Sequence, residues 1–354
     1  MSGIGASSHY TVEKFRHLNG PILDIRSPKE FEQGHWPGAF NLPLFTNEER
    51  AAVGTTYNKE GQKKSILLGL NLVAPKLLRL KSSLEQINKY STKKSPIRSN
   101  KIIRLYCWRG GMRSRSIAWL AKLLSIKPIV LQGGYKNYRN WVLQQFEKEW
   151  PFLLIGGKTG TGKTDLLHAL SQKGESVIDL EGLANHRGSS FGSLGLREQP
   201  STEHYENLIA EKLDSFKFNL STRIYIEAES SNIGKCRVPI GIYKQMKSSP
   251  ILEISRPMEE RLNNLIKVYG NQDKGELALA TNRISRRLGP QRTKTALKAI
   301  SDSNWEQACR AMLDYYDRCY DFELKKAKER TQIDISGQNS EYVAEKIISE
   351  SFMN

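Results

Sequence analysis

One of the four cysteines in this 354-residue chain stands directly before a segment rich in glycine and arginine. The segment reads Cys107-Trp108-Arg109-Gly110-Gly111-Met112-Arg113-Ser114. A helix N-terminus and neighbouring arginines can lower a thiol pKa by several units from ~8.5, and the resulting thiolate is the nucleophile. Two glycines let successive backbone N–H groups surround an anion, and Arg109 and Arg113 can each bind an oxyanion through two hydrogen bonds. The segment predicts a reactive cysteine beside an oxyanion site.

The other cysteines have no such context. Cys236, Cys309 and Cys319 are scattered along the chain, and no pair has the C-x-x-C spacing. A disulfide framework and a structural zinc site are therefore not expected. Each of these thiols is interpreted as a free thiol in a reducing compartment.

A second segment fits the phosphate-binding pattern G-x-x-x-x-G-K-[ST] in full. It reads Gly157-Lys158-Thr159-Gly160-Thr161-Gly162-Lys163-Thr164 and lies between an apolar run and a helical pattern. The glycines Gly157, Gly160 and Gly162 let backbone N–H groups approach phosphates. Lys163 neutralises phosphate oxygens, and the Thr164 hydroxyl can ligate Mg²⁺. The context makes this a P-loop.

The acidic metal partner of this P-loop is not settled by the sequence. Candidate carboxylates at the ends of neighbouring strands are Asp179, Glu181, Glu227 and Glu229. The usual partner is an aspartate, so a glutamate at this place weakens the case for ordinary ATP hydrolysis. Glu227 could equally be a solvated strand end, and the metal site stays unassigned.

Strands alternate with helices twice along the chain, which predicts two parallel, doubly wound sheets. The first series has expected strands at 21–26, 101–107 and 128–134, a loop at 34–43 that leads into a short strand, and helical structure at 60–91. The second series has expected strands at 152–157, 176–182, 223–230, 251–255 and 331–336. A helix at 135–150 joins the two series, and residues 91–101 look like an exposed connector. The predicted domains are 1–138 and 151–354, with a linker helix at 139–150 and a helical insert at about 258–330.

Positive charge is concentrated in the first part of the chain. Residues 1–150 hold 25 Lys/Arg and 10 Asp/Glu, whereas residues 151–354 hold 29 and 27, and the whole chain carries +17. Such a field favours a polyanionic partner such as nucleic acid, although it also serves solubility, and it does not distinguish RNA from DNA. No run of about 18 apolar residues and no secretory leader pattern is seen, so no membrane association is expected and the cytoplasm is the expected location.

On these residues the sequence resembles a rhodanese domain and, more narrowly, the tRNA 2-selenouridine synthases. The resemblance in the first half rests on Cys107-Trp108-Arg109-Gly110-Gly111-Met112-Arg113-Ser114 and on Leu23-Asp24-Ile25-Arg26-Ser27-Pro28, Glu30-Phe31, Gly34-His35, Pro37-Gly38-Ala39, Asn41-Leu42-Pro43-Leu44, Glu48-Glu49-Arg50, Val53-Gly54-Thr55, Gly133-Gly134-Tyr135-Lys136 and Arg139. In the second half it rests on 179–192, Glu227-x-Glu229-Ser230, Ile233-Gly234 and Arg286-Arg287-Leu288-Gly289. Ala228 departs from the family pattern, which puts a role for that position in doubt. The implied fold class is α/β, with an N-terminal rhodanese-like doubly wound sheet and a C-terminal P-loop NTPase-like parallel sheet that carries a helical insert.

The resemblance implies an enzyme that replaces the sulfur of wobble 2-thiouridine in tRNA by selenium. Cys107 would carry selenium from selenophosphate as an S-selanylcysteine, and Arg109 and Arg113 would hold the phosphate. His35 and Asp24 would brace the loop. The family is thought to make S-geranyl-2-thiouridine first, so geranyl diphosphate is expected at the P-loop, where Mg²⁺ can also bind. The implied partners are tRNA and an enzyme that supplies selenophosphate.

Basic residues in the insert are candidates for tRNA contacts. Arg283, Arg286, Arg287 and Arg292 cluster there with Lys294 and Lys298, and the spacing of the first three predicts one shared helix face. A helix at 305–330 adds Trp305, Tyr315, Tyr316 and Tyr320. These aromatic side chains could stack on unstacked bases or belong to the core, and the arginines could pair with acidic neighbours instead of phosphates.

Two other functions stay open. The chain could be a sulfur or selenium carrier that passes its cargo to another enzyme, which the attached P-loop argues against. It could also be a P-loop kinase acting on a nucleotide or RNA with a regulatory rhodanese module. The sequence leaves the set of tRNAs, the oligomeric state, the choice of selenium over sulfur and the choice of geranyl diphosphate over a nucleotide undetermined.

Overall fold

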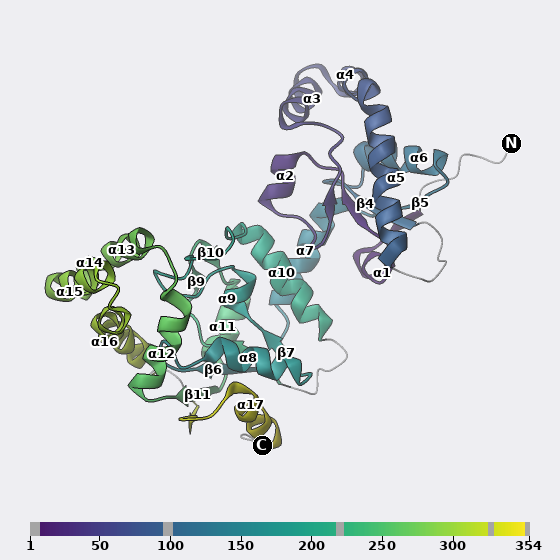
Figure 1. The fold of residues 1–354 in the computed structure, drawn as a ribbon. Coiled ribbons are helices and arrows are strands. Elements are labelled where there is room, and N and C mark those ends of the chain that lie inside the picture. Colours follow the sequence, from purple (N-terminus) through teal and green to yellow (C-terminus); the bar gives the residue numbers. More distant parts are fainter. Residues whose placement is uncertain (1–7, 95–101, 217–222, 325–328, 351–354) are drawn as a thin grey trace. The chain divides into compact units, whose positions relative to one another are not determined.

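The computed structural model describes residues 8–94, 102–216, 223–324 and 329–350. The chain divides into two compact units, Met1–Gln144 and Gln145–Asn354. Figure 1 traces both units along the chain. No helix among the described residues is long and apolar enough to cross a membrane.

The first unit is built on a five-stranded sheet in which every neighbouring pair is parallel. The strand order is β1-β5-β4-β2-β3. The strands are β1 Ser8–Tyr10, β2 Ile22–Asp24, β3 Phe40–Asn41, β4 Ile102–Tyr106 and β5 Lys127–Leu131. β2, β4 and β5 are largely buried, as expected for parallel strands that are covered on both faces. The predicted strands at 21–26, 101–107 and 128–134 are confirmed in shorter form.

The helices of the first unit differ from prediction in one region. They are α1 Val12–Arg16, α2 Pro28–Gln33, α3 Asn47–Glu60, α4 Gln62–Val73, η1 Ala74–Lys76, α5 Leu77–Lys94, α6 Met112–Leu123 and α7 Gly134–Phe146. The helical structure expected at 60–91 is confirmed, divided among α4, η1 and α5, but the helix α3 before it was not predicted. A capping box between Thr46 and Glu49 starts α3 earlier, and Gly61 ends it with a φ of 88°. Most of the connector expected at 91–101 lies outside the described residues, and α5 includes its first four.

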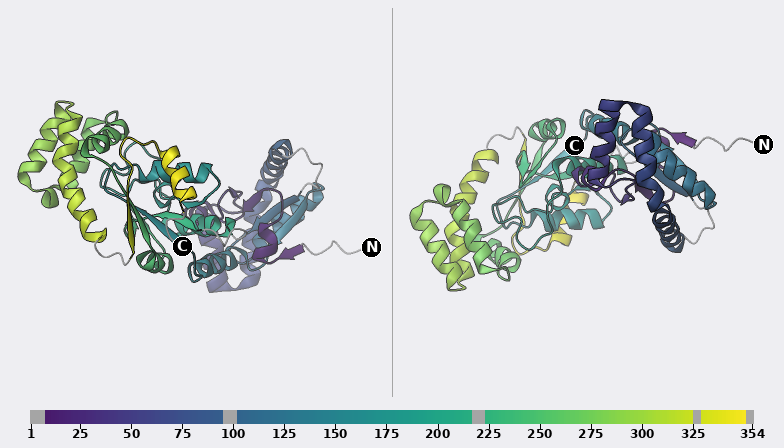
Figure 2. Two further views of the ribbon diagram at one scale, coloured as in Figure 1. Left: turned by 90° about the horizontal axis from the view of Figure 1, so that it is seen from below. Right: turned by 90° about the horizontal axis from the view of Figure 1, so that it is seen from above.

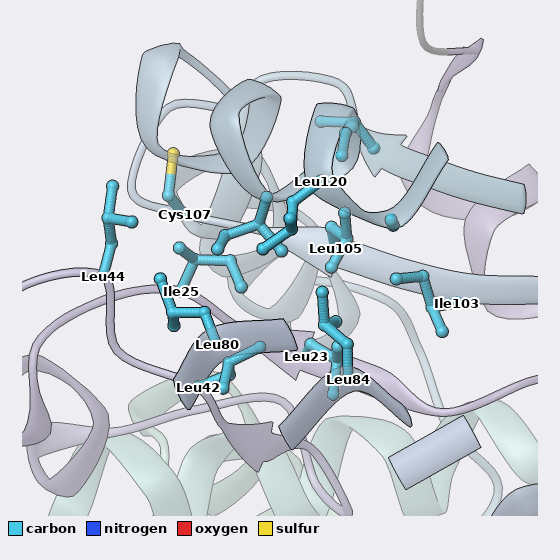
Figure 3. Close-up of a cluster of buried hydrophobic side chains, with 14 of the residues drawn as sticks. Leu23, Ile25, Leu42, Leu44, Leu80, Leu84, Ile103, Leu105, Cys107 and Leu120 are labelled. Carbon is cyan, nitrogen blue, oxygen red and sulfur yellow. The ribbon is translucent and has the colours of Figure 1, made fainter. Parts of the chain in front are cut away.

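The core of the first unit joins the sheet to α5 and α6. Leu23, Ile25, Ile103 and Leu105 are fully buried there, together with Leu84 from α5. Figure 3 shows the Cys107 side chain at the border of this cluster, with its sulfur turned away from Leu80 and Leu84. The core therefore fixes the strand that ends at Cys107.

The second unit has its own parallel five-stranded sheet, in the order β12-β11-β6-β8-β7. The strands are β6 Phe152–Gly156, β7 Ser176–Ile178, β8 Ile224–Glu227, β11 Ile251–Ser255 and β12 Arg330–Asp334, and a small antiparallel pair is formed by β9 Asn232–Ile233 and β10 Cys236–Arg237. The five predicted strands are present, but the strands predicted at 176–182 and 223–230 are shorter in the structure, where they end at Ile178 and Glu227. The reason at β7 is that Asp179 caps a short helix, since its Oδ1 accepts a hydrogen bond from the Gly182 N–H at 2.6 Å.

The helices of the second unit fall into two groups. Those around the sheet are α8 Lys163–Gln172, α9 Leu180–Leu183, α10 Thr202–Ser215, α11 Ile240–Ser248 and α17 Ser340–Ser349. Those of the insert are α12 Met258–Tyr269, α13 Lys274–Arg283, α14 Ser285–Leu288, α15 Pro290–Ser301 and α16 Trp305–Leu324. Figure 2 shows the insert helices gathered at one side of this unit, with their own core around Leu277, Ile284 and Ile300. The α/β fold class with a helical insert is confirmed.

Candidate functional site

Cys107 lies at the carboxyl end of β4, and α6 begins five residues later. The backbone of its loop is held by the start of α7. The Tyr135 N–H donates to the Cys107 carbonyl at 2.8 Å, and the Lys136 N–H donates to the Trp108 carbonyl at 3.0 Å. Gly134 has a φ of 62°, and a Cβ there would lie 2.2 Å from the Cys107 carbonyl oxygen. This close approach, together with the positive φ, requires glycine at position 134.

The two arginines predicted beside Cys107 have different surroundings. Arg113 Nη1 donates to Glu30 Oε2 at 2.7 Å, and Glu30 belongs to the first turn of α2. Burial alone would raise the pKa of Glu30, but the hydrogen bond and charge of Arg113 outweigh it and hold that pKa below its usual range. Arg109 is exposed and forms no ion pair with any residue that the structure describes. Arg109 is therefore the arginine with its charge available to an incoming anion.

A buried ion pair braces this end of the first sheet. Arg26 Nη2 donates to Asp24 Oδ2 at 2.6 Å and to the Gly34 carbonyl at 2.6 Å, while its guanidinium lies 3.7 Å from the Tyr135 ring centroid. Burial raises the pKa of Asp24 despite the charge of Arg26. His35 stacks on Phe31 with 3.7 Å between ring centroids. These side chains contact the framework around the loop, as the bracing role requires.

The P-loop joins β6 to α8 and is held in part by the insert. Arg261 Nε donates to the Thr159 carbonyl at 2.9 Å, and Asn264 Nδ2 donates to the Gly160 carbonyl at 2.9 Å. Gly160 has a φ of 84°, and a Cβ there would lie 2.7 Å from the Arg261 carbonyl oxygen. The insert helix α12 thus holds two P-loop carbonyls, those of Thr159 and Gly160.

The P-loop lysine contacts a tyrosine of the insert. Lys163 Nζ donates to the Gly157 carbonyl at 2.8 Å and to Tyr320 Oη at 3.0 Å. Tyr320 Oη in turn donates to Glu229 Oε1 at 3.2 Å. Sequence reasoning placed Tyr320 among aromatic residues for RNA or core, and it missed this contact, which joins positions 157 residues apart.

Carboxylates gather on the other side of Lys163. Glu227 is fully buried at the end of β8, and its Oε2 accepts a hydrogen bond from the Glu181 N–H at 3.2 Å. Burial and the neighbouring Glu229 raise the pKa of Glu181 to about 8, although the charge of Lys163 opposes this. Burial and nearby Asp179 raise the pKa of Glu227 well above its usual range. Burial and mutual repulsion of these carboxylates therefore favour their protonated forms.

P-loop residues Thr159 to Thr164 line one cavity of about 1150 Å³ together with Asp179, Glu181 and Glu229, whereas Glu227 is buried behind it. Other walls come from α12 and α16 and from the segment that follows α9, including Arg187, Ser189, Tyr269 and Tyr316. In the described parts of the chain, no three His, Cys, Asp or Glu side chains converge to hold a metal. The cavity can take a molecule that is larger than a diphosphate alone.

The basic residues of the insert do not form the predicted helix face. Arg283 ends α13, whereas Arg286 and Arg287 belong to the separate helix α14, because the chain bends at Ile284. Arg287 lines the P-loop cavity. Arg286 instead lines an open groove of about 730 Å³ with Lys294 and Lys298. The three arginines that the spacing placed on one helix face therefore belong to two helices, and Arg286 and Arg287 line different cavities.

Arg292 is the fourth predicted tRNA contact. Its Nη2 lies 3.2 Å from Asp314 Oδ2, in a pair whose side chains are both substantially exposed. An exposed pair of this kind contributes about 0–1 kcal/mol to stability, so it can open when a phosphate approaches. Arg283 is exposed at the end of α13.

The fold and these two loops define a class of protein in which a rhodanese-like domain with a cysteine loop is joined to a P-loop domain with a helical insert. The model of the tRNA 2-selenouridine synthase AAA domain matches residues 150–350, and that of the rhodanese-like domain matches residues 10–140. The chain belongs to the tRNA 2-selenouridine synthase family.

Similar proteins span nearly the same length. The tRNA 2-selenouridine synthase of Psychromonas ingrahamii is 34% identical over 348 residues, which cover 89% of this chain and 91% of that protein. The tRNA 2-selenouridine synthase of Sulfurovum sp. is 33% identical, with 88% and 91% covered. That of Hydrogenovibrio crunogenus is 33% identical, with 90% and 92% covered. Both domains therefore contribute to the match.

Proposed function

We propose that this protein is an enzyme that replaces the sulfur of wobble 2-thiouridine in tRNA by selenium from selenophosphate, through an S-geranyl-2-thiouridine intermediate made from geranyl diphosphate. The observation that carries the proposal is that one chain combines a glycine- and arginine-rich cysteine loop with a P-loop. One loop surrounds a cysteine, and the other opens into a cavity of about 1150 Å³. The relatives named above are tRNA 2-selenouridine synthases, and their similarity to this chain extends over both domains.

The P-loop would bind geranyl diphosphate. The loop amides and Lys163 would hold the diphosphate, as P-loops hold phosphate groups in general. The sulfur of 2-thiouridine would attack the first carbon of the geranyl chain, forming a C–S bond while the C–O bond breaks and its electron pair leaves on the diphosphate. Mg²⁺ would neutralise charge on the diphosphate, with the Thr164 hydroxyl as its protein ligand.

The cysteine loop would carry the selenium. Cys107 lies at the end of β4, five residues before the N-terminus of α6, and Arg109 is two residues away in the same loop, so both would favour a thiolate. The geranylthio group is a better leaving group than a bare thiocarbonyl sulfur, so alkylation prepares the base for selenium to enter. Arg113 would help to bind the phosphate of selenophosphate while its ion pair with Glu30 fixes its position.

Mass spectrometry of tRNA nucleosides tests the proposal. Substrate tRNA is incubated with the enzyme, geranyl diphosphate and selenophosphate, each present or omitted in turn. We expect S-geranyl-2-thiouridine with geranyl diphosphate alone and 2-selenouridine when both are present. Transfer of ³²P from ATP to RNA or to a nucleotide, without either product, would identify a P-loop kinase instead. Selenium bound to the protein without any modified tRNA would identify a carrier.

A further inference from the structure

A small apolar cavity of about 60 Å³ lies within the helical insert, next to the P-loop cavity. Its inner walls are formed by Phe191 and by insert residues such as Leu277, Ile300, Ala308 and Met312. Cys309 is another wall residue, and burial raises the pKa of its thiol to about 11. The cavity therefore has an apolar interior.

The two cavities share one wall. Thr159 of the P-loop, Ser189, Leu265, Tyr269 and Tyr316 line both of them. These shared residues include the hydroxyl-bearing side chains of the small cavity, so its polar groups lie on the side of the P-loop. The small cavity therefore adjoins the cavity of a P-loop ligand and is separated from it only by side chains that line both.

An apolar cavity of this kind selects for hydrocarbon. Protein interiors are close-packed and contain few voids larger than a water molecule. Water needs two to four polar partners, and a base or sugar needs hydrogen bonds that Leu277, Ile300 and Met312 cannot supply. We propose that this cavity binds the distal hydrocarbon of a prenyl diphosphate whose phosphates are held by the P-loop. The inference rests on the proposed function and adds to it a site that limits chain length.

The size of the cavity sets the expected chain length. A dry cavity of about 150 Å³ holds benzene, which is about 25 Å³ per carbon, so 60 Å³ accommodates about two to three carbon groups. This is the branched end of an isoprenoid chain, a carbon with its two methyl groups. A ten-carbon chain would place its diphosphate and first unit in the large cavity and its branched end in the small one. A longer chain would bring more carbons than the small cavity holds.

The test fills the cavity and compares prenyl diphosphates of different length. Ala308→Leu places about three more carbons into the cavity, and Ala311→Leu on the same helix is the control because Ala311 lines neither cavity. Each excluded methylene weakens binding about fourfold, so the KM of Ala308→Leu for geranyl diphosphate should rise about 15- to 60-fold. Inhibition by inorganic pyrophosphate, which has no chain, should stay within about twofold of wild type and reports that the P-loop is intact.

A second variant enlarges the cavity. Met312→Ala should raise the ratio of kcat/KM for farnesyl over geranyl diphosphate by about tenfold or more, and this readout applies even if Ala308→Leu does not fold. Normal geranyl transfer with an unchanged KM in Ala308→Leu, or an unchanged ratio in Met312→Ala, would overturn the inference while the proposed function stands. If the wild-type enzyme makes no geranylated tRNA at all, the proposed function and the inference both fail.

Discussion

At the scale of single residues, the four cysteines differ in their surroundings. Burial raises the pKa of Cys236 and of Cys309 to about 11, so both stay protonated at neutral pH. Cys107 alone among the four follows a strand end and precedes an amide-rich turn with a free arginine beside it. Cys107 is itself only 3% exposed, so its place at the strand end, and not its exposure, supports it as the nucleophile.

Cys107→Ser should abolish 2-selenouridine formation and leave geranylation within about twofold of wild type, because a chalcogen carrier is needed only for the second step. Cys236→Ser is the matched control, since its buried side chain keeps a donor for the Pro200 carbonyl. Both modified nucleosides are measured by mass spectrometry. Selenouridine production by Cys107→Ser at the wild-type rate would exclude the carrier mechanism.

Lys163→Ala should abolish geranylation, because the diphosphate loses its main cationic partner. A charge-assisted contact contributes about 1.5–3 kcal/mol, which corresponds to about 10- to 150-fold in binding. Lys173→Ala, at the far end of α8 and paired with Glu345, is the control. Binding of geranyl diphosphate is measured by calorimetry. Retained geranyl binding with loss of a nucleotide-dependent step would assign the P-loop to a nucleotide.

The raised pKa of Glu181 predicts a specific dependence of stability on pH. Its pKa is about 8 in the folded protein against 4.5 in the unfolded chain, so between these values only the folded state holds the proton. Stability is therefore expected to fall as pH rises from about 5 to 8 and to level off above that. Glu181→Gln should flatten this part of the profile of Tm against pH. An identical slope in both proteins would mean that Glu181 titrates normally.

At the scale of elements, the two loops could be predicted from sequence because each is a local pattern. Cys107 and the P-loop both lie between a strand and a helix, as their spacing indicated. The contact between Lys163 and Tyr320 could not be predicted, because it depends on how the insert folds back over 157 residues. The bend at Ile284 was missed for a related reason, since i, i+3 spacing holds only within one uninterrupted helix.

Tyr320→Phe tests how the insert influences the P-loop. In the structure Lys163 Nζ donates a hydrogen bond to the Tyr320 hydroxyl, so a diphosphate must compete with this hydroxyl for the lysine. Removing a hydrogen bond worth about 0.5–1.5 kcal/mol should tighten binding of pyrophosphate about 2- to 12-fold. Calorimetry with pyrophosphate gives this value directly. Weaker binding by Tyr320→Phe would instead mean that the hydroxyl itself contacts the diphosphate.

At the scale of the whole molecule, the charge of +17 is the property that bears on tRNA. Each neutralised phosphate contributes about 0.7–0.9 to the slope of log K against log salt. Arg286, Lys294 and Lys298 line one open groove and are all exposed, so we expect them to contact the tRNA backbone together. Arg287 is left out of this set because it lines the P-loop cavity.

Replacing Arg286, Lys294 and Lys298 by alanine should flatten the salt slope of tRNA binding by about two to three units and weaken all substrate tRNAs alike. Arg310→Ala is the control, since Arg310 is already paired with Glu259 and Glu306. Filter binding at several salt concentrations gives the slopes. A well-folded triple variant with an unchanged slope would exclude this groove as a tRNA contact.

The hydrogen bonds from the start of α7 to the cysteine loop have a practical consequence for dissecting this enzyme. The helix that supplies the N–H groups of Tyr135 and Lys136 continues to Phe146, past the boundary between the two units at Gln144. Excising the rhodanese-like part after Gly133 would remove both donors and leave the Cys107 and Trp108 carbonyls without them. A separately expressed first domain must therefore include at least the start of α7 if the cysteine loop is to keep these two hydrogen bonds.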